Sequence, residues 1–478
     1  MGPDLLPPTT MGGRVVTKKR KRGDHGGAEE DARAPPDPDL ISSLPDCVLG
    51  TIVSLLGTED GARTAALARR WRHVWRDAAP LNLDDPLSNV ADDDRRVQRI
   101  SQILAAHPGP TRRVAFRSLR LRRNALHYDA WFRLPLLDTI QELVLCFRHD
   151  IGYPQLPVSA LRFAAALRVL DVRHCRFPAA GSVSGSPAFP CLTDLSLHEV
   201  VVDEELLEGI FSNSPGIDSM RLHNNLGHRR LRVSNLPRLR RLAVAVKRCS
   251  TASIKEEEEI ELHDLVVEDA VSLEQLVLDQ IDHGPSVDIT GATKLKVLGY
   301  LQTGFPVSDL GNLVFNKGML PVSPGKQLST VRTLALDVAK LNLKQVADSL
   351  TYFPSIEKLH MKIESQWMSM ESTGVFYAPV TPIECLDRSL RIIELQPYKG
   401  YVSHVEFAKF FVERAKVLEL MKFGVCGGHS PRWVQHQCTQ FSTESKASRR
   451  AQFSFGHEIE SPNWMEDCFT RDDPFSKK

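Results

Sequence analysis

The sequence Leu192-Thr193-Asp194-Leu195-Ser196-Leu197 places apolar residues at its first, fourth and sixth positions. The same pattern returns 25 residues further on, as Ile217-Asp218-Ser219-Met220-Arg221-Leu222. Because successive side chains of a strand point to opposite faces, the unit predicts a short strand that buries one face. A single strand cannot bury that face by itself, so the pattern also predicts neighbours of the same kind.

The unit occurs eleven times between residues 116 and 395. Its middle positions are Leu119, Leu143, Leu170, Leu195, Met220, Leu242, Leu276, Leu298, Leu334, Leu359 and Ile393, and the first unit reads Phe116-Leu119-Leu121. The first five intervals fall within the roughly 20 to 29 residues of leucine-rich repeats. Several later intervals are longer and require insertions, one of which contains the acidic run Glu256 to Glu259. These spacings predict an irregular solenoid whose parallel strands line one face.

An ordinary βαβ sheet is the alternative arrangement for such strands. It requires amphipathic return segments of about 10 to 15 residues between the strands. Residues 201–212 could supply such a helix, whereas residues 175–190, with several Gly, Ser and Pro, could not. The solenoid is therefore favoured.

Residues 39–76 carry a different pattern. Pro45 suits the first position of a helix. One apolar stripe of this helix consists of Val48, Ile52, Leu55 and Leu56, and a second consists of Leu49 and Val53. A segment of about 40 residues has no large core in which both stripes could be buried, so the excess apolar surface predicts a protein partner.

The remainder of this segment predicts two more short helices. Gly57 ends the first helix, and Thr58 is a suitable N-cap for the second. Trp71 and Trp75 stand four residues apart on the third helix, among several arginines. Paired tryptophans often anchor interfaces, but these two rings could also simply cap the small bundle, and for Trp71 both interpretations stay open.

This segment resembles an F-box. The resemblance rests on Leu-Pro-Asp-x-Val-Leu from Leu44 and on Ala-Arg-Thr-x-x-Leu-x-x-Arg-Trp-Arg-x-x-Trp from Ala62, a form familiar from plant F-box proteins. It implies docking to a Skp-type adaptor and, through it, to a cullin in an SCF ubiquitin ligase. The positions that the resemblance assigns to contacting or supporting the adaptor are Leu44, Pro45, Leu49, Ile52, Leu56, Leu67, Trp71 and Trp75. Gly61 and Ala68 depart from the usual pattern, in which larger or more polar residues are common.

Residues 385–421 are similar to the FBD region of plant F-box proteins, and residues 448–455 fit the end of that region. Phe407, Phe410, Phe411, Arg414 and Leu418 indicate an amphipathic helix between two strands. Such a unit could close the open end of a solenoid. The order F-box, leucine-rich repeats, FBD matches one family of plant proteins and implies recruitment of a substrate without identifying it.

Composition narrows the possible functions. The chain has 478 residues, 42% of them hydrophobic, and a formal net charge of +1, which argues against a globally basic nucleic-acid binder. Membrane association is not expected, because no apolar run approaches the roughly 20 residues of a spanning helix. Nine scattered cysteines suit reduced thiols, and a nuclear or cytoplasmic location is expected. The cluster Lys18, Lys19, Arg20, Lys21 and Arg22 resembles a nuclear import signal, although it could also be a solvated charge run.

Motifs for catalysis and cofactor binding were sought as well. We find no phosphate-binding glycine loop, no His-Glu-x-x-His and no Gly-x-Ser-x-Gly, so we expect neither catalysis nor a cofactor. Cys426, His429, His436 and Cys438 are of types that bind zinc, but their spacing fits no compact finger, and no metal site is expected. The arginines at 112, 113, 117, 120, 122 and 123 could meet phosphate, yet they alternate with apolar residues as on a solvated strand. Nucleic acid is therefore an unlikely partner.

Together these features predict an α/β chain with a three-helix F-box, an irregular leucine-rich-repeat solenoid and an α+β FBD cap. The expected boundaries are a basic tail at 1–38, the F-box at 39–80, a linker at 81–110, the solenoid at 111–380, the FBD-like region at 381–460 and a tail at 461–478. The expected function is recognition of an unidentified target protein for a ubiquitin ligase. The alternative is a leucine-rich-repeat binding protein that acts without a ligase.

Overall fold

The structure, a computed structural model, describes residues 40–41, 43–78, 81–84, 93–107, 109–148, 152–179, 187–246, 262–279, 286–302, 313–315, 328–338, 341–363, 382–425, 427, 430–442, 445–457 and 475. The chain divides into two units, Met1–Leu44 and Pro45–Lys478. Of the first unit the structure describes four residues, which form a turn in which the Leu44 amide donates to the carbonyl of Ile41 at 3.1 Å.

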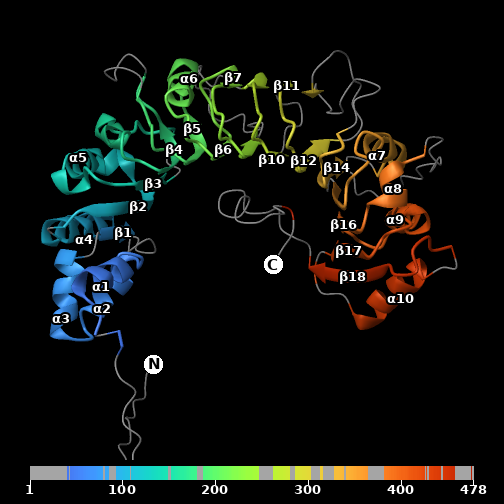
Figure 1. The fold of residues 1–478 in the computed structure, drawn as a ribbon, viewed down its shortest axis with the longest axis horizontal. Coiled ribbons are helices and arrows are strands. Elements are labelled where there is room, and N and C mark those ends of the chain that lie inside the picture. Colours follow the sequence, from blue (N-terminus) through green and yellow to red (C-terminus); the bar gives the residue numbers. More distant parts are fainter. Residues whose placement is uncertain are drawn as a thin grey trace, which may run out of the picture. The chain divides into compact units, whose positions relative to one another are not determined.

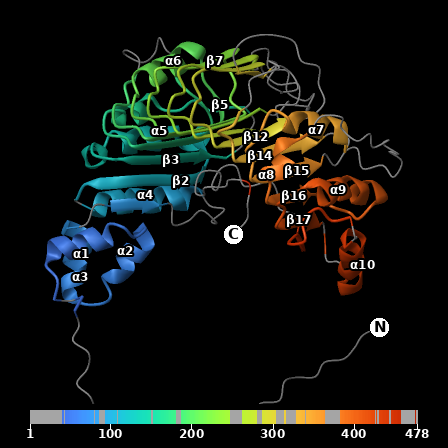
Figure 2. The same ribbon diagram turned by 45° about the vertical axis from the view of Figure 1, so that its right-hand side comes forward.

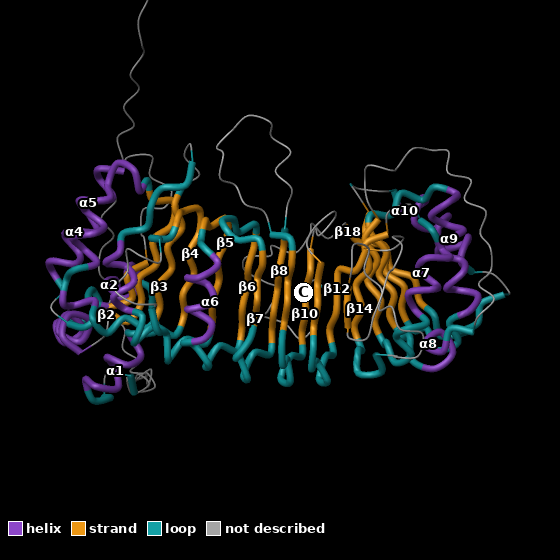
Figure 3. Tube along the Cα trace, turned by 90° about the horizontal axis from the view of Figure 1, so that it is seen from above, coloured by secondary structure: helices purple, strands orange, loops and turns teal. Residues whose placement is uncertain are grey.

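One parallel sheet of fourteen strands dominates the second unit (Figures 1 and 3). In spatial order the strands are β1 (Leu81–Asp84), β2 (Thr111–Leu119), β3 (Glu142–Phe147), β4 (Val169–Arg176), β5 (Asp194–Val201), β6 (Ser219–His223), β8 (Arg241–Ala245), β10 (Gln275–Asp279), β12 (Val297–Gln302), β14 (Thr333–Val338), β15 (Lys358–Ile363), β16 (Ile392–Gln396), β17 (Leu420–Val425) and β18 (Gln452–His457). This stepwise order, with each strand parallel to the one before, is that of a leucine-rich-repeat sheet.

The register of the sheet follows the repeat pattern. From Leu143 on β3 to Ile393 on β16, the middle residue of each predicted unit is the direct partner of the next. These side chains all point to the same face of the sheet, and they are buried in the main core on that face. The first unit is the exception, because Leu143 pairs with Val114 rather than with Leu119, and the prediction for that unit is therefore wrong by five residues.

The return segments cover one face of the sheet. Helices α4 (Asp93–Ala106), α5 (Leu121–Phe132), α6 (Glu204–Ser212), α7 (Leu343–Leu350), α8 (Glu384–Arg388), α9 (Val402–Arg414) and α10 (Pro431–Phe441) and short 3-10 turns at Pro135–Leu137 and Val158–Phe163 lie on this side (Figures 1 and 2). The expected helix within residues 201–212 is α6, and the side chain of Asp203 caps it by accepting from the Leu206 amide at 2.8 Å.

Strands replace helices behind the middle of the sheet. A second sheet has the order β13 (Leu313–Phe315), β11 (Ser286–Ile289), β9 (Asp264–Val267) and β7 (Arg230–Val233). Leu231, Leu265 and Ile289 of this sheet are buried in the same core as the middle residues of the repeats. The opposite face of the main sheet carries no described helix, and we call it the helix-free face.

The FBD-like region continues the sheet. Strands β16, β17 and β18 pair in parallel, and α9 and α10 lie on the same side as the earlier helices. The predicted amphipathic helix is α9, which buries Phe407, Phe410 and Phe411. The region expected as an α+β cap is thus built like the repeats that precede it.

Three short helices open the second unit: α1 (Asp46–Val53), α2 (Thr58–Thr64) and α3 (Arg69–His73), followed by a π-helical turn at Val74–Ala78. Asn82 on β1 ties them to the sheet, because its side-chain amide donates to the carbonyl of Leu56 at 3.1 Å. The predicted cap at Thr58 is wrong. The cap position is Gly57, and the Thr58 hydroxyl instead donates to the Asn82 carbonyl and accepts from the Asp84 amide at 3.0 Å.

Within the part of the chain that the structure describes, no helix has both the length and the apolar character required to cross a membrane.

Candidate functional site

Helix α1 presents one of its two apolar stripes to solvent. Leu49 and Val53 are buried, at 0% and 3% exposure, whereas Val48, Ile52 and Leu55 are exposed by 40%, 42% and 68%. The exposed residues follow one another at helical spacing and therefore form one surface. Leu67, 68% exposed, adds a further apolar side chain from the turn after α2.

The residues expected to contact or support an adaptor fall into three groups. Leu49 and Trp71 are buried, Leu44, Leu56 and Trp75 are half-buried, and Pro45, Ile52 and Leu67 are exposed. Trp71 is 7% exposed, so it stabilises the helices from within, and its alternative interpretation as part of the bundle describes it better. Contact with a partner can come directly from the exposed group.

The glycine that departs from the F-box pattern has a packing role. A Cβ atom at Gly61 would lie 2.9 Å from Nε1 and 3.1 Å from Cδ1 of Trp75. The Trp75 ring in turn meets His107 edge to face, with centroids 5.7 Å apart. Trp75 therefore packs between α2 and the loop that leads into β2. Ala68, the other departure, is the exposed residue that precedes α3 and makes no side-chain cap.

The second candidate surface is the helix-free face of the main sheet. Its central row consists of residues that are register partners or lie directly against each other: Asp171, Ser196, Arg221, Ala243, Val277, Gly299, Ala335, His360, Glu394 and Lys422. Polar residues occupy both ends of this row, and small or apolar residues occupy its middle. A partner lying across the strands would therefore meet a polar, an apolar and again a polar region.

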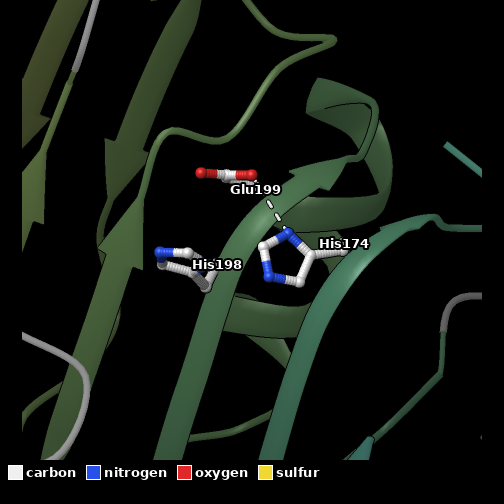
Figure 4. Close-up of side chains that lie close together, drawn as sticks. All are labelled: His174, His198 and Glu199. Atoms are coloured by element: carbon white, nitrogen blue, oxygen red, sulfur yellow. Dashed lines mark hydrogen bonds and ion pairs between the residues drawn. The ribbon is translucent and has the colours of Figure 1, made fainter. Parts of the chain in front are cut away.

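The first polar region lies on β4, β5 and β6. Arg173 makes a bidentate ion pair with Asp171, with nitrogen–oxygen distances of 2.9 and 2.7 Å. On the neighbouring strands the rings of His198 and His223 stack at 4.2 Å, and His174 meets His198 edge to face at 5.2 Å (Figure 4). A shallow pocket lies here, lined by residues 196–198, 221–223 and 243.

A repeated backbone bulge brings these side chains together. His174, Glu199 and Asn224, spaced 25 residues apart, have φ of 57°, 48° and 49°. Left-handed backbone is uncommon for His and Glu. On β4 and β5 it places two consecutive polar residues between buried ones, where strict alternation would allow one. Asn225 holds the bulge on β5, accepting from the Val200 amide and donating to the Leu197 carbonyl, both at 3.1 Å.

The charge state of this region follows from burial. Desolvation, together with repulsion from the neighbouring His223, lowers the pKa of His198 to about 3, so its imidazole is neutral at physiological pH. Nδ1 of His174 lies 3.0 Å from Oε2 of Glu199, within hydrogen-bonding distance. The region thus offers the neutral imidazole of His198 and the ion-paired Asp171 and Arg173 to a polar partner.

The geometry of His174, His198 and Glu199 determines whether they could bind a metal ion. Among the described residues, His174, His198 and Glu199 offer potential ligand atoms that all lie within 4.8 Å of one another (Figure 4). Zinc bonds of roughly 2.0–2.2 Å in a tetrahedron require these atoms to be about 3.3 Å apart. The residue types suit zinc, but the side chains would have to rotate, and His174 and Glu199 already contact each other. The arrangement fits a polar contact surface better than a preformed metal centre.

The other candidates from the sequence are dispersed. Arg113 pairs with Glu142 at 2.6 Å and with Asp84 at 3.1 Å, and Arg120 pairs with Asp93 at 3.2 Å. Arg122 and Arg123 belong to α5 rather than to a strand, so the arginines form no single basic stripe. Of the zinc candidates, His436 and Cys438 lie on α10, whereas Cys426 and His429 lie outside the described residues, as do residues 18–22 of the basic cluster.

Sequence reasoning missed the polar residues of the helix-free face. A signal for them exists: the pairs at 173–174, 198–199 and 223–224 recur at the same 25-residue interval as the buried residues. The interval alone does not reveal that both members of the pairs 173–174 and 198–199 lie between buried positions, because this depends on the bulge.

Comparisons with known proteins agree with this architecture. Parallel strands stacked in sequence order, with buried residues recurring near every 25 positions, define a leucine-rich-repeat protein. Residues 128–361 match the family described as "FBD-associated F-box protein At5g56370, LRR repeats", and residues 378–423 match FBD. Over these residues the chain is similar to FBD-associated F-box proteins with leucine-rich repeats.

Curated relatives point the same way. The chain is 28% identical over 191 residues to the F-box/FBD/LRR-repeat protein At1g13570 of Arabidopsis thaliana, covering 39% of this chain and 44% of that relative. It is 29% identical over 179 residues to the MEIOTIC F-BOX protein MOF of Oryza sativa subsp. japonica, covering 34% and 36%. The matched segments thus span less than half the length of these relatives.

Proposed function

We propose that the chain is a substrate-recognition subunit of an SCF-type ubiquitin ligase. In this proposal, helices α1 to α3 dock a Skp-type adaptor that is itself bound to a cullin. The observation that carries the proposal is the exposed stripe of Val48, Ile52 and Leu55, which lies opposite the buried Leu49 and Val53. Exposed apolar side chains in one row are typical of a protein interface, and the similarity to F-box proteins is consistent with an F-box at this position.

The target protein is expected to bind on the helix-free face. Its central row presents side chains from many strands to one side, and this row is supported from behind by the continuous core. Rigid strands hold such side chains in fixed positions, which lowers the entropic cost of binding. The polar ends of the row provide specificity through charge and hydrogen bonding, and its apolar middle provides affinity.

The chain itself performs no chemistry in this scheme. It holds a target near a ubiquitin-charged enzyme that is bound elsewhere on the scaffold and so raises the effective concentration of the target's lysines. The attachment of α2 to β1 through Thr58 and Asn82 suits this role, because it holds the docking helices in a fixed position relative to the sheet.

The docking step can be tested by replacing one exposed residue of α1. Ile52→Asp places a charge in the apolar stripe, whereas Thr51→Asp places the same charge on an exposed neighbour outside it. On size-exclusion chromatography after co-expression with a Skp-type adaptor, we expect wild type and Thr51→Asp to co-elute with the adaptor and Ile52→Asp to elute alone. Co-elution of Ile52→Asp at the wild-type level would contradict the assigned docking surface.

The alternative function is a repeat protein that binds its target without a ligase. Ubiquitination of co-purifying proteins distinguishes the two functions. We expect it to be lost when Leu44 and Pro45 are both replaced by alanine, while target binding persists. Unchanged ubiquitination in that variant would favour the alternative.

Nuclear entry is a separate proposal. Residues 18–22 supply five consecutive basic residues of the kind that import receptors bind, and the chain is proposed to act in the nucleus, the cytoplasm or both. Replacement of all five by alanine should reduce the nuclear fraction of a tagged chain. An unchanged distribution would dismiss the cluster as a signal.

A further inference from the structure

The apolar middle of the helix-free face carries small side chains. Ala243, Gly299 and Ala335 occupy positions of the central row where other strands carry Arg221, Asp171 or Glu394. A Cβ atom at Gly299 would collide with the Cβ atom of Ala335, so the two strands meet closely at this point. Small side chains between larger ones leave room above the sheet for a side chain from elsewhere.

Phe475 packs against these small side chains. Its side chain is 2% exposed and forms a separate apolar cluster with Ala243, Val277, Val297, Tyr300 and Ala335, which we call the Tyr300 pocket. The rings of Phe475 and Tyr300 meet edge to face at 5.1 Å, and the imidazole of His360 lies 5.4 Å from Phe475 on the other side. Aromatic rings prefer such edge-to-face contacts.

The walls of the pocket are themselves held in place. The ammonium group of Lys362 lies 5.6 Å from the centroid of the Tyr300 ring. Nδ1 of His360 lies 3.4 Å from Oε2 of Glu394, and both residues are about 5% exposed. Phe475 thus covers the apolar residues of the Tyr300 pocket and lies beside the buried pair of His360 and Glu394.

The cluster is distinct from the main core. The residues of the main core point to the helix-bearing side of the sheet, whereas the Tyr300 pocket opens on the side assigned to target binding. The sheet would remain intact without Phe475, because the strands that form the pocket are held by their ladders and by the core behind them. A contact that is not required for the fold, at a proposed binding surface, suits an exchangeable ligand.

We propose that the Tyr300 pocket is a binding site for a single aromatic side chain, that Phe475 of the chain's own C-terminal segment occupies it, and that a target displaces Phe475 with an aromatic residue of its own. The part of this inference that concerns the target rests on the proposed function; occupation by Phe475 does not. Tethering keeps the segment at a high effective concentration, so a target must bind additional parts of the face to compete. Phe475 would thereby exclude weak, non-specific partners.

Thiol accessibility in the full-length chain tests the occupation of the pocket. Val277→Cys places a thiol on the floor of the Tyr300 pocket, and its modification by a maleimide can be located by peptide mass spectrometry. We expect slow labelling in the otherwise wild-type chain and at least about tenfold faster labelling after Phe475→Ala, given the free energy of burying a Phe side chain. Phe475→Tyr should retain the protection, and Ser476→Ala is the matched control that leaves it unchanged.

Addition of the chain's own segment in trans tests whether the pocket selects an aromatic side chain. The probe is the peptide Thr-Arg-Asp-Asp-Pro-Phe-Ser-Lys-Lys, residues 470–478. We expect it to restore protection of the thiol in the Phe475→Ala chain, and the same peptide with Ala in place of Phe should not. Equal labelling with and without Phe475, or equal protection by both peptides, would overturn the inference. Because neither measurement requires an adaptor or ubiquitin, this result is independent of the test of ligase function.

Discussion

Gly61 on α2 and Trp75 after α3 are so close that a Cβ atom added to Gly61 would lie 2.9 Å from Nε1 of the indole. This contact joins α2 to the π-helical turn that follows α3, and the same indole meets His107 in front of β2. A residue that departs from the F-box pattern therefore coincides with a local packing requirement. Trp75 therefore packs α2 against the segment that leads into β2.

A larger residue at position 61 should weaken the packing of α2 against Trp75. Gly61→Leu forces the Trp75 ring to move, and overpacking of this kind typically costs about 1–3 kcal/mol. We expect faster amide hydrogen exchange in residues 46–73 and weaker binding to the adaptor. Ala62→Leu is the control, since Ala62 is exposed and adjacent. Wild-type exchange rates in Gly61→Leu would show that Trp75 moves without cost.

The two stripes of α1 should respond differently to alanine. Leu49 is fully buried, and Leu49→Ala should destabilise the helical segment by about 2–5 kcal/mol through loss of burial and formation of a cavity. Ile52→Ala, at a position 42% exposed, should leave its stability within about 0.5 kcal/mol of wild type yet weaken adaptor binding. Hydrogen exchange measures the first effect and titration with the adaptor the second. Similar stability losses in both variants would mean that the exposed stripe is covered within the chain.

Gly299 should be the least replaceable glycine of the sheet. Its φ is 155°, and a Cβ atom would approach the backbone oxygen of Ala335 to 2.7 Å. Gly299→Ala must therefore separate β12 from β14 or distort them, and we expect a clearly lower denaturation midpoint. Gly456→Ala on β18 is the matched control, because a Cβ atom there meets nothing within 4 Å. Equal midpoints for the two variants would contradict the role assigned to Gly299.

The repeat register was predictable because the buried residues of each strand are large and apolar. Leu170, Leu195 and Met220 pair as their spacing predicts. The prediction failed at β2. There Val114 and Phe116 pair with Leu143 and Leu145, whereas the predicted residues Leu119 and Leu121 only have the same spacing. An apolar pattern read from one sequence cannot distinguish the pair Val114 and Phe116 from the pair Leu119 and Leu121, because both pairs have the same spacing.

The surface residues depend on geometry that hydrophobic periodicity does not encode. His174 and Glu199 meet because both adopt left-handed backbone, and neither residue type predicts this conformation. Phe475 contacts Tyr300 across a large part of the chain, and an isolated Phe in a polar tail carries no signal of its partner. The two apolar stripes of α1 were predictable, in contrast, because helical spacing alone separates them, but the sequence did not indicate that the stripe of Leu49 and Val53 is the buried one.

His404 makes the stability of the C-terminal region depend on pH. Its side chain is 2% exposed, and burial, reinforced by the charge of Lys399, lowers its pKa from 6.5 to about 4. The folded state keeps this imidazole neutral, whereas the unfolded chain takes up a proton below pH 6.5. The free energy of unfolding should therefore fall as the pH decreases from about 6.5 to 4, and His404 should account for about 2 kcal/mol between pH 7.5 and 5.

The comparison that isolates this contribution is His404→Gln. Glutamine cannot take up the proton but retains an acceptor for the Lys399 amide, which donates to Nδ1 of His404 at 3.3 Å in the wild type. Denaturant unfolding at both pH values should show a larger loss of stability in the wild type than in the variant. His198, whose pKa is also lowered by burial, is present in both chains, so its contribution cancels. An identical pH dependence in the two chains would mean that His404 is protonated without opening the packing around Tyr398 and Tyr401.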